Sequence, residues 1–316
     1  MRQVWSRLRK LNIGVIGDGT HSLRIQKILK ESSLKFKIYK PIQKKNKNRY
    51  SSLAEIEKCD VIFILSPNST HFNYLKKFRK KSYIFCEKPP TNQIDELNKL
   101  YKFNSNKIYF NYNFRYSKLG HIIKKINKDK FGKFQYCNII TSHNLAQKKN
   151  YLNSWRSKKK LCPKGVFEVV SIHWIDFSNY YFKIKKLSNI ILKNTSKVGN
   201  SFDNSHVSLS TNGGGIVNIF TSYNSPYCNN ATFIYENGII KKDEKFIKIY
   251  GPAKNEDKKG FTISPKLIKS VKINEEEDYN NSLKFSVIKF LDAAAKKKSF
   301  DKYEYFVSLE SNSLIL

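Results

Sequence analysis

A short apolar segment, a glycine-rich turn and a helical pattern follow one another near the start of this sequence, and they limit the fold more than any other feature. Residues 11–16 indicate a buried strand, and residues 23–31 carry apolar side chains at helical spacing. Gly17 and Gly19 lie between them, and Ser22 takes the third position of a Gly-x-Gly-x-x-Gly pattern. Such a turn brings backbone N–H groups and the positive end of a helix dipole to a phosphate, which is typical of dinucleotide binding.

The alternation of strands and helices continues through the first third of the chain. Further strands are predicted at residues 36–39, 61–65, 83–85 and 108–112, and helices at 53–58, 70–81 and 91–100. Short strand–helix alternation is the pattern of a doubly wound parallel sheet, whose strands all end at one edge. We therefore expect an α/β fold with an N-terminal Rossmann domain over residues 1–118.

The pattern changes after residue 118. Helices are predicted at residues 119–128 and 167–181, a strand at 134–141, and strand-like segments with turn signals between them from 187 to 273. Residues 278–297 and 303–316 have helical patterns. The prediction for residues 119–316 is an α+β domain with a largely antiparallel open sheet, whose C-terminal helices are able to pack back on the first domain.

One lysine lies in a setting that suits proton transfer. The predicted strand at residues 83–85 leads to Glu87 and Lys88, and Pro89 fixes φ and lacks an N–H, so Lys88 is kept out of a helix. A lysine at the end of a buried strand, beside a dinucleotide turn, is a candidate acid or base. The alternative is a solvated turn lysine in a chain that contains many lysines.

A second polar segment follows the third predicted strand. Ser66, Pro67, Asn68 and His71 would lie at the carboxyl edge of the sheet, where a nicotinamide ribose binds. The alternative is an ordinary helix start capped by Ser69 or Thr70. No acid follows the second strand to hold a ribose 2′-hydroxyl, whereas Lys40, Lys44 and Lys45 could meet a 2′-phosphate. The cofactor is therefore NAD or NADP, with a lean toward NADP.

The formal charge of +34 raises the question of nucleic-acid binding. Lysine supplies most of this charge, no arginine occurs after Arg156, and the lysines are spread along a chain rich in Asn, Ile, Tyr and Phe. Arginine is the preferred residue for base and phosphate recognition, so we expect no specific nucleic-acid partner. The charge instead favours anionic small molecules by long-range steering.

Cysteine usage and hydropathy place further limits on the protein. The 5 cysteines include no Cys-x-x-Cys pair, which argues against a metal site or a disulfide framework and fits a reducing cytoplasm. No apolar segment is long enough for a secretion signal or a membrane span, so we expect a cytoplasmic protein with no membrane partner.

These motifs stand together in the order and spacing of one family. The glycine turn, the Ser-Pro-Asn-x-x-His segment, Glu87-Lys88-Pro89, Asn113-x-Arg115-Tyr116, and Trp155-Arg156 followed by Gly165 and residues 171–176 cover most of the chain. The sequence resembles the glucose–fructose oxidoreductase/inositol dehydrogenase/rhizopine catabolism (Gfo/Idh/MocA) family. The resemblance implies a Rossmann domain, followed by a mixed-sheet domain that binds substrate and builds a homodimer or homotetramer.

The resemblance also implies an NAD(P)-dependent oxidoreductase that acts on the CH–OH group of a sugar or sugar-like polyol. It assigns catalysis to Lys88 and His173. Cofactor-binding residues are predicted at Gly17, Asp18, Gly19, Thr20, His21, Ser66, Pro67, Asn68, His71, Glu87, Lys88 and Arg115. Substrate-binding residues are predicted at Lys88, Asn113, Tyr116, Arg156, Glu168 and His173.

Two details leave alternatives open. Many family members have an aspartate four residues before the histidine, but Val169 holds that position here. Glu168 would lie about 140° from His173 on a regular helix, so either the helix start is irregular or the acid is missing. Arg115 and Arg156 are scarce arginines, suited either to a forked contact with a carboxylate, phosphate or cofactor or to a structural ion pair.

The resulting hypothesis is a reductase or dehydrogenase of an acidic or nucleotide-linked sugar in surface-glycan synthesis. The missing aspartate leaves a catalytically degenerate dinucleotide- or sugar-binding relative as an alternative. A basic nucleic-acid-binding protein and a biliverdin-reductase-like activity on a non-sugar ring are weaker alternatives, since a fold does not fix a substrate.

Overall fold

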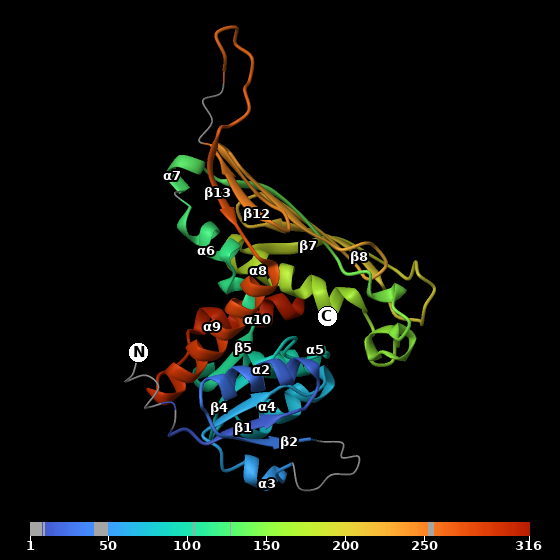
Figure 1. The fold of residues 1–316 in the computed structure, drawn as a ribbon, viewed down its shortest axis with the longest axis vertical. Coiled ribbons are helices and arrows are strands. Elements are labelled where there is room, and N and C mark those ends of the chain that lie inside the picture. Colours follow the sequence, from blue (N-terminus) through green and yellow to red (C-terminus); the bar gives the residue numbers. More distant parts are fainter. Residues whose placement is uncertain (1–7, 9, 41–49, 104, 127, 252–255) are drawn as a thin grey trace. The chain divides into compact units, whose positions relative to one another are not determined.

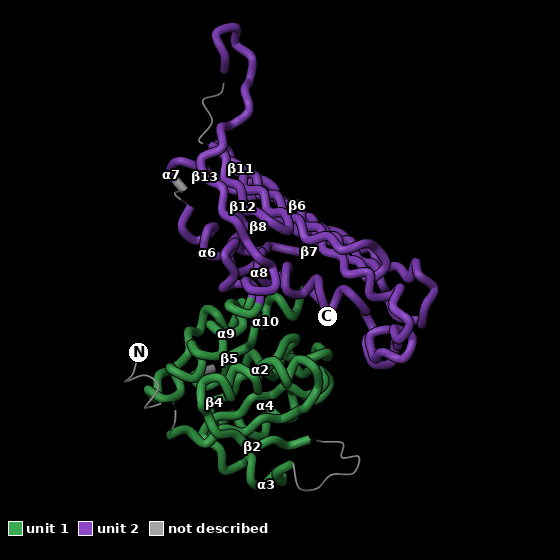
Figure 2. The backbone as a smooth tube through the Cα atoms, viewed as in Figure 1, with its two compact units in different colours: residues 1–113, 280–314, 316 green, residues 114–279, 315 purple. Residues whose placement is uncertain are grey.

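The computed structural model describes residues 8, 10–40, 50–103, 105–126, 128–251 and 256–316. The chain forms two compact units (Figure 2). Unit 1 contains residues 1–113, 280–314 and 316, and unit 2 contains residues 114–279 and 315. The C-terminal helices therefore belong to the first unit. Lys44 and Lys45, which the sequence suggests as 2′-phosphate contacts, lie outside the described residues.

Unit 1 is built on a five-stranded parallel sheet, as predicted (Figure 1). The strand order is β2-β1-β3-β4-β5, and every residue of β1, β3 and β5 is buried. Such continuous apolar strands require helices on both faces. The order reverses direction between β1 and β3, so the ends of these strands mark the switch point at which parallel sheets bind ligands. The strands are β1 (Ile13–Ile16), β2 (Phe36–Tyr39), β3 (Val61–Ile64), β4 (Tyr83–Glu87) and β5 (Ile108–Asn111).

The helices of unit 1 come from both ends of the chain. Phe290 of α9 packs against Phe63 of β3 and Phe85 of β4, with ring centroids 5.3 and 5.4 Å apart. The long C-terminal helix thus closes the core of the sheet, although it lies far from it in the sequence. The helices are α2 (Thr20–Glu31), α3 (Leu53–Ile56), η2 (Asn68–Thr70), α4 (His71–Phe78), α5 (Ile94–Tyr101), η3 (Ser105–Lys107), α9 (Glu275–Ala295) and α10 (Lys302–Ser313).

Unit 2 is built on an eight-stranded sheet in the order β13-β12-β11-β10-β6-β9-β8-β7. Only β6 and β9 pair in parallel, so the prediction of a largely antiparallel sheet is confirmed. Buried residues alternate along β8 and β10, which leaves one face for the core. The strands are β6 (Phe134–Ser142), β7 (Ile184–Lys193), β8 (Asn204–Thr211), β9 (Ile216–Ser222), β10 (Cys228–Tyr235), β11 (Gly238–Lys242), β12 (Phe246–Tyr250) and β13 (Leu267–Lys272).

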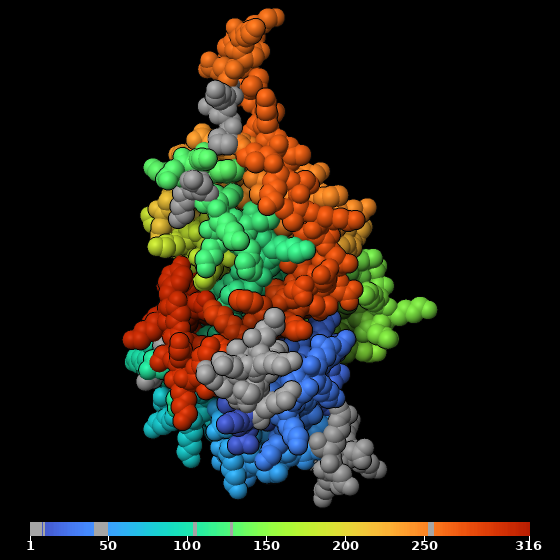
Figure 3. Space-filling model, turned by 60° about the vertical axis from the view of Figure 1, so that its left-hand side comes forward, coloured from blue at the N-terminus to red at the C-terminus, as the bar shows by residue number. Residues whose placement is uncertain are grey.

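A helix covers the core face of this sheet. In α8, Phe177 packs on Phe233 of β10, and the indole N–H of Trp174 donates to Thr141 Oγ1 of β6 at 2.8 Å. The remaining helical segments of the unit are η4 (Asn113–Tyr116), α6 (Lys118–Lys125), α7 (Lys128–Phe131), η5 (Leu145–Gln147), η6 (Tyr151–Asn153), η7 (Trp155–Ser157), the π-helix η8 (Phe167–Ser171) and α8 (Ile172–Phe182). Beyond β12, residues 256–266 form a narrow protrusion (Figure 3). None of the helices in the described ranges has the length and apolar character that a membrane crossing requires.

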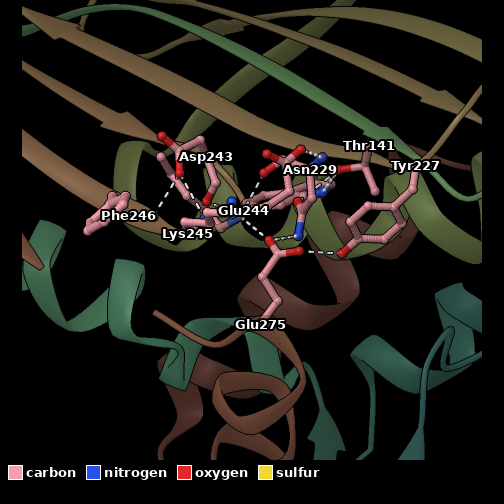
Figure 4. A network of polar contacts seen from close by, with 10 residues as sticks. Thr141, Tyr227, Asn229, Asp243, Glu244, Lys245, Phe246 and Glu275 are labelled. Carbon is pink, nitrogen blue, oxygen red and sulfur yellow. Dashed lines mark hydrogen bonds and ion pairs between the residues drawn. The ribbon is translucent and has the colours of Figure 1, made fainter. Parts of the chain in front are cut away.

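The first turn of α9 is tied to the sheet of unit 2 by the carboxylate of Glu275 (Figure 4). This carboxylate contacts the ammonium of Lys242 at 2.5 Å, accepts a hydrogen bond from Asn229 Nδ2 at 2.6 Å, and accepts another from the Tyr227 hydroxyl. Lys242 is almost fully buried, so the carboxylate compensates for the loss of water around its ammonium group.

Replacing Glu275 by glutamine should therefore destabilise unit 2. We expect Glu275→Gln to lower the free energy of unfolding by about 2–3 kcal/mol, because the buried ammonium of Lys242 loses its counter-charge. Urea denaturation measures this change. Glu276→Gln on the exposed side of the same turn is the control, with an effect within about 0.5 kcal/mol. Equal stability of the two variants would contradict the role assigned to Glu275.

Candidate functional site

Glycine occupies two positions after β1 for different structural reasons. Gly17 has φ of +111°, and a Cβ there would lie 2.5 Å from the carbonyl oxygen of Leu65, so only glycine fits. Gly19 precedes α2 with extended backbone, and a Cβ at this position would meet no atom within 4 Å. Open space therefore lies in front of Gly19, beside a helix of 12 residues with no acid in its first turn. This arrangement fits the pyrophosphate of a dinucleotide.

Side chains around the turn hold its shape. Ser22, at the third position of the motif, is fully buried and donates to the carbonyl oxygen of Gly17 at 2.9 Å. Asp18 accepts hydrogen bonds from Tyr50 at 2.7 Å and from Gln26 at 3.3 Å. Thr20 is exposed at the start of α2. The predicted cofactor residues Gly17, Asp18, Gly19 and Thr20 therefore belong to one ordered turn.

The carboxylate of Glu87 lies buried at the end of β4, surrounded by donors. His21 Nε2 donates to Glu87 Oε1 at 2.8 Å, Asn111 Nδ2 donates to the same oxygen at 2.6 Å, and the backbone N–H of Lys88 lies 3.4 Å from Oε2. Burial by itself raises the pKa of Glu87, but the contacts with His21, Asn111 and Lys88 outweigh it, and the pKa is lowered. Glu87 is thus a carboxylate at neutral pH, beside Lys88.

Lys88 is half-buried and directly follows this carboxylate, and the Lys88–Pro89 peptide bond is cis. The side chain of His71 contacts this turn. Its Nδ1 lies 2.8 Å from the carbonyl oxygen of Pro89, and its Nε2 lies 2.9 Å from that of Ser66. The ring thus joins the segment after β3 to the turn that carries Lys88.

The position of His71 differs from the predicted one. Its side chain is fully buried, and burial lowers its pKa, although its contacts with the two carbonyl groups act in the opposite direction. A ring with no exposed surface cannot touch a cofactor, so the prediction of a cofactor contact is corrected to a positioning role. Ser66 is also largely buried, and its hydroxyl lies 2.6 Å from that of Thr70, whereas Pro67 and Asn68 keep exposed surface.

Arg115 was predicted as a cofactor contact, but it forms the structural ion pair that was the alternative. Its Nε donates to Asp176 Oδ2 at 2.8 Å and its Nη2 donates to Oδ1, and both side chains are buried. The guanidinium also lies over the ring of Tyr180 at 4.8 Å. A buried carboxylate occupies the fork of Arg115, so a ligand contact by this group is not supported.

The other residues of this segment lie in different settings. Asn113 is buried and donates to Ser282 Oγ of α9 at 2.9 Å, while Tyr116 is half-buried. Arg156 is half-buried, and its guanidinium lies over the ring of Trp155 at 4.6 Å. Arg156 and Tyr116 therefore keep surface for a ligand, and Asn113 does not.

The segment before His173 is an irregular helix, as one of the two alternatives required. Phe167–Ser171 form a π-helix, and α8 starts at Ile172. In a π-helix the hydrogen bonds run from residue i to i+5, so each turn holds about one residue more than an α-helical turn. The angle of about 140° expected for a regular helix therefore does not apply to the five positions between Glu168 and His173.

Glu168 and His173 are both held within unit 2. Glu168 is buried, and its Oε1 accepts from the backbone N–H of Lys164 at 3.4 Å. The half-buried ring of His173 stacks on Phe114, with centroids 4.5 Å apart and an interplanar angle of 17°. The carboxylate of Glu168 is therefore enclosed near Lys164, while the ring of His173 keeps some exposed surface.

Three polar residues that bind side chains described above were not predicted from the sequence. Asn111 is the last residue of β5, and its place beside the end of β4 gave a usable signal, since parallel strands end at one edge. Asp176 and Ser286 lie 61 and 175 positions from their partners Arg115 and Asn111, and nothing in the sequence connects these pairs. Within the described ranges no three His, Cys, Asp or Glu side chains cluster as a metal site would require, and all five cysteines are free.

Comparison with known proteins gives a consistent result. Residues 8–108 match the family described as "Oxidoreductase family, NAD-binding Rossmann fold", and residues 121–241 match the "GFO/IDH/MocA C-terminal domain". A putative NADPH-dependent oxidoreductase from Desulfitobacterium hafniense superposes with a TM-score of 0.77 at 13% identity, covering 97% of this chain and 94% of that one.

Two further solved structures have the same fold. A levoglucosan dehydrogenase in complex with NADH and levoglucosan gives a TM-score of 0.75 at 16% identity, with 96% of each chain covered. An Agrobacterium radiobacter oxidoreductase in complex with NAD+, L-tartaric acid and magnesium gives a TM-score of 0.74 at 14% identity, covering 97% of this chain and 94% of that chain. At these identities the likeness establishes the fold.

The glycine turn generates a paired prediction. Gly19→Ala should weaken NADH binding at least tenfold at nearly unchanged stability, because its methyl group enters the space in front of the turn. Gly17→Ala should lower the free energy of unfolding by about 1–3 kcal/mol, because it strains the backbone against Leu65. Fluorescence titration and urea denaturation measure the two effects. Unchanged binding by Gly19→Ala would contradict the assignment of this turn.

The Arg115–Asp176 pair generates a second prediction. Arg115→Ala should lower the free energy of unfolding by about 3–5 kcal/mol, because Asp176 is left buried and unpaired, while the Kd for NADH stays within about twofold. Arg24→Ala, at an exposed position, is the control and should cost less than about 1 kcal/mol. A stable Arg115→Ala protein that no longer binds NADH would restore the cofactor assignment.

Proposed function

Because the chain belongs to the Gfo/Idh/MocA family of NAD-binding oxidoreductases, we propose that it transfers a hydride to or from a sugar or sugar derivative, at a hydroxyl or carbonyl carbon. The observation that carries this proposal is the setting of Lys88. It follows a buried carboxylate at the end of β4, on a turn held by His71, at the sheet edge that also carries the glycine turn. A reaction at this edge brings a dinucleotide and a proton-exchanging group together.

The residues present have separable tasks in this reaction. The bound dinucleotide supplies or accepts the hydride. The backbone of Gly17 and Gly19 and the start of α2 would hold the pyrophosphate, and the segment 66–68 would offer polar groups to the nicotinamide ribose. Lys88 removes the proton from the substrate hydroxyl in oxidation and returns it in reduction. The charge of Glu87 favours the protonated lysine, which suits a general acid in the reductive direction.

Unit 2 supplies the residues proposed for the substrate. His173 is proposed to bind or share the proton of the substrate hydroxyl, with Glu168 as the acid on the same helical segment, and Arg156 and Tyr116 to contact other groups of the sugar. The degenerate alternative depends on Val169, and we propose that Glu168, on the irregular segment before α8, takes the part of the missing aspartate. An active enzyme is the better proposal.

For the substrate class we propose an acidic or nucleotide-linked sugar of surface-glycan synthesis. The charge of +34 attracts anions to the protein surface. Among the structural neighbours, the Agrobacterium radiobacter oxidoreductase was solved with L-tartaric acid, a dicarboxylate, and the levoglucosan dehydrogenase with a neutral anhydrosugar. A panel of uronic acids, nucleotide sugars and neutral sugars, assayed by the absorbance of the reduced dinucleotide, separates these classes.

For the cofactor we propose a preference for NADP. No acid follows β2, where Tyr39 and Lys40 stand, and the Lys40 ammonium lies 5.6 Å from the centre of the Tyr50 ring. A 2′-phosphate is compatible with this cationic strand end, whereas a ribose 2′-hydroxyl would find no carboxylate directly after β2 to accept its hydrogen bond. The neighbours named above differ in this respect: the Desulfitobacterium hafniense protein is described as NADPH-dependent, and the other two were solved with NADH or NAD+. Parallel titrations with NADH and NADPH decide the preference.

We further propose a cytoplasmic homodimer or homotetramer. Exposed apolar side chains on β7 and β13 support self-association: Ile190, Ile191, Leu267 and Ile268. Light scattering at several protein concentrations tests the oligomeric state, and fractionation of the source cells tests the compartment.

The catalytic role of Lys88 gives the sharpest prediction. Lys88→Ala should lower kcat on an identified substrate by about 10²–10⁴-fold, because the proton loses its exchange partner, while the Kd for the dinucleotide changes little. Lys81→Ala, at an exposed position before β4, is the control and should keep the wild-type rate. Full turnover by Lys88→Ala would reject the mechanism, and turnover loss in both variants would point to a general effect of charge.

A further inference from the structure

Glu87 is one member of a buried chain of hydrogen bonds that extends to the C-terminal part of the sequence. The Tyr109 hydroxyl lies 2.8 Å from Ser286 Oγ, and Ser286 Oγ donates to Asn111 Oδ1 at 2.7 Å. Asn111 Nδ2 and His21 Nε2 both contact Glu87 Oε1. All members lie in unit 1, and only His21 keeps substantial exposure, with 34% of its side chain accessible.

The chemistry of the groups fixes the direction of this chain. A carboxylate only accepts hydrogen bonds, so both contacts to Glu87 must be donated. Asn111 therefore presents its amide nitrogen to Glu87 and its amide oxygen to Ser286. The Ser286 hydroxyl is committed as the donor to that oxygen, so Tyr109 donates to Ser286. Removing the Ser286 hydroxyl would release the oxygen of Asn111 and leave a buried acceptor without a donor.

The same logic defines the state of His21. Its Nε2 must carry a proton for Glu87, so the ring is either the Nε2–H tautomer or the cation, and Nδ1 is the nitrogen left for another partner. His21 is the second residue of α2, directly after the open turn at Gly19. A histidine at this point can donate a hydrogen bond to a phosphate, and it donates from Nδ1 as well as Nε2 when both ring nitrogens carry protons.

We propose that Ser286 and Asn111 are positioning residues for dinucleotide binding, which act through Glu87 to orient His21 as a donor to the pyrophosphate. This inference rests on the dinucleotide site of the proposed function. It adds that the affinity of the site depends on a serine of α9, which is separated by 175 positions from Asn111 and has no contact of its own with the glycine turn among those described.

The test combines affinity with the state of the histidine ring. Ser286→Ala should weaken NADH and NADPH binding about threefold to tenfold in fluorescence titrations, and Ser286→Thr, which keeps the hydroxyl, should restore the wild-type Kd. Ser308→Ala removes another buried serine hydroxyl of unit 1, which donates within its own helix, and should leave the Kd unchanged. Thermal melting of each variant separates lost affinity from unfolding.

A double variant decides whether Ser286 acts through His21. His21→Gln should also weaken binding, and adding Ser286→Ala to it should have no further effect. In ¹⁵N-histidine spectra, Ser286→Ala should move the signals of His21, assigned from His21→Gln, and leave those of the other five histidines in place.

The outcomes separate this inference from the proposed function. Independent, additive effects of the two substitutions, or an unchanged Kd with unmoved His21 signals in Ser286→Ala, would overturn the inference while the dinucleotide site stands. If the wild-type protein binds neither NADH nor NADPH, the proposed function is overturned, and the inference with it.

Discussion

The buried carboxylate of Glu87 is the constraint on which the candidate site depends. An ionised group away from water is very unfavourable unless hydrogen-bond donors surround it. Here the donors come from His21 on α2, Asn111 on β5 and the backbone of Lys88. The hydrogen bonds to the Glu87 carboxylate therefore hold the glycine turn, the ends of two strands and the lysine proposed for catalysis in one arrangement.

The same constraint shapes unit 2. Asp176 is buried with Arg115, and Glu275 is largely buried with Lys242, and each pair joins segments that are distant in the sequence. The chain has 25 acidic residues against 59 lysines and arginines, and each internal pair is neutral, so the excess of positive charge lies outside these pairs. A net charge of this size thus follows from surface lysines around ordinary internal ion pairs, and it requires no nucleic-acid partner.

Much of the first unit could be predicted from sequence because its signals are local. Continuous apolar runs bounded by turn residues gave the parallel strands, and Gly17, Gly19 and Lys88 follow strands whose ends must share an edge. The alternating segments of the second unit likewise gave its antiparallel sheet.

The errors arose where the partner of a side chain is distant or where backbone geometry is irregular. A histidine at a helix start looks the same whether it faces a ligand or, like His71, is enclosed between two carbonyl groups. Arg115 could not be recognised as a structural residue, because Asp176 meets it only in the folded chain. The π-turn before His173 depends on one shifted hydrogen-bond register, which has no distinct residue pattern.

A crystal structure of the protein with bound NADPH tests the central claim most directly. The pyrophosphate should lie against the backbone of Gly17 and Gly19 within hydrogen-bonding distance of His21, with the nicotinamide on the side of Glu87 and Lys88. A dinucleotide bound elsewhere, or a nicotinamide remote from Lys88, would contradict both the site and the mechanism.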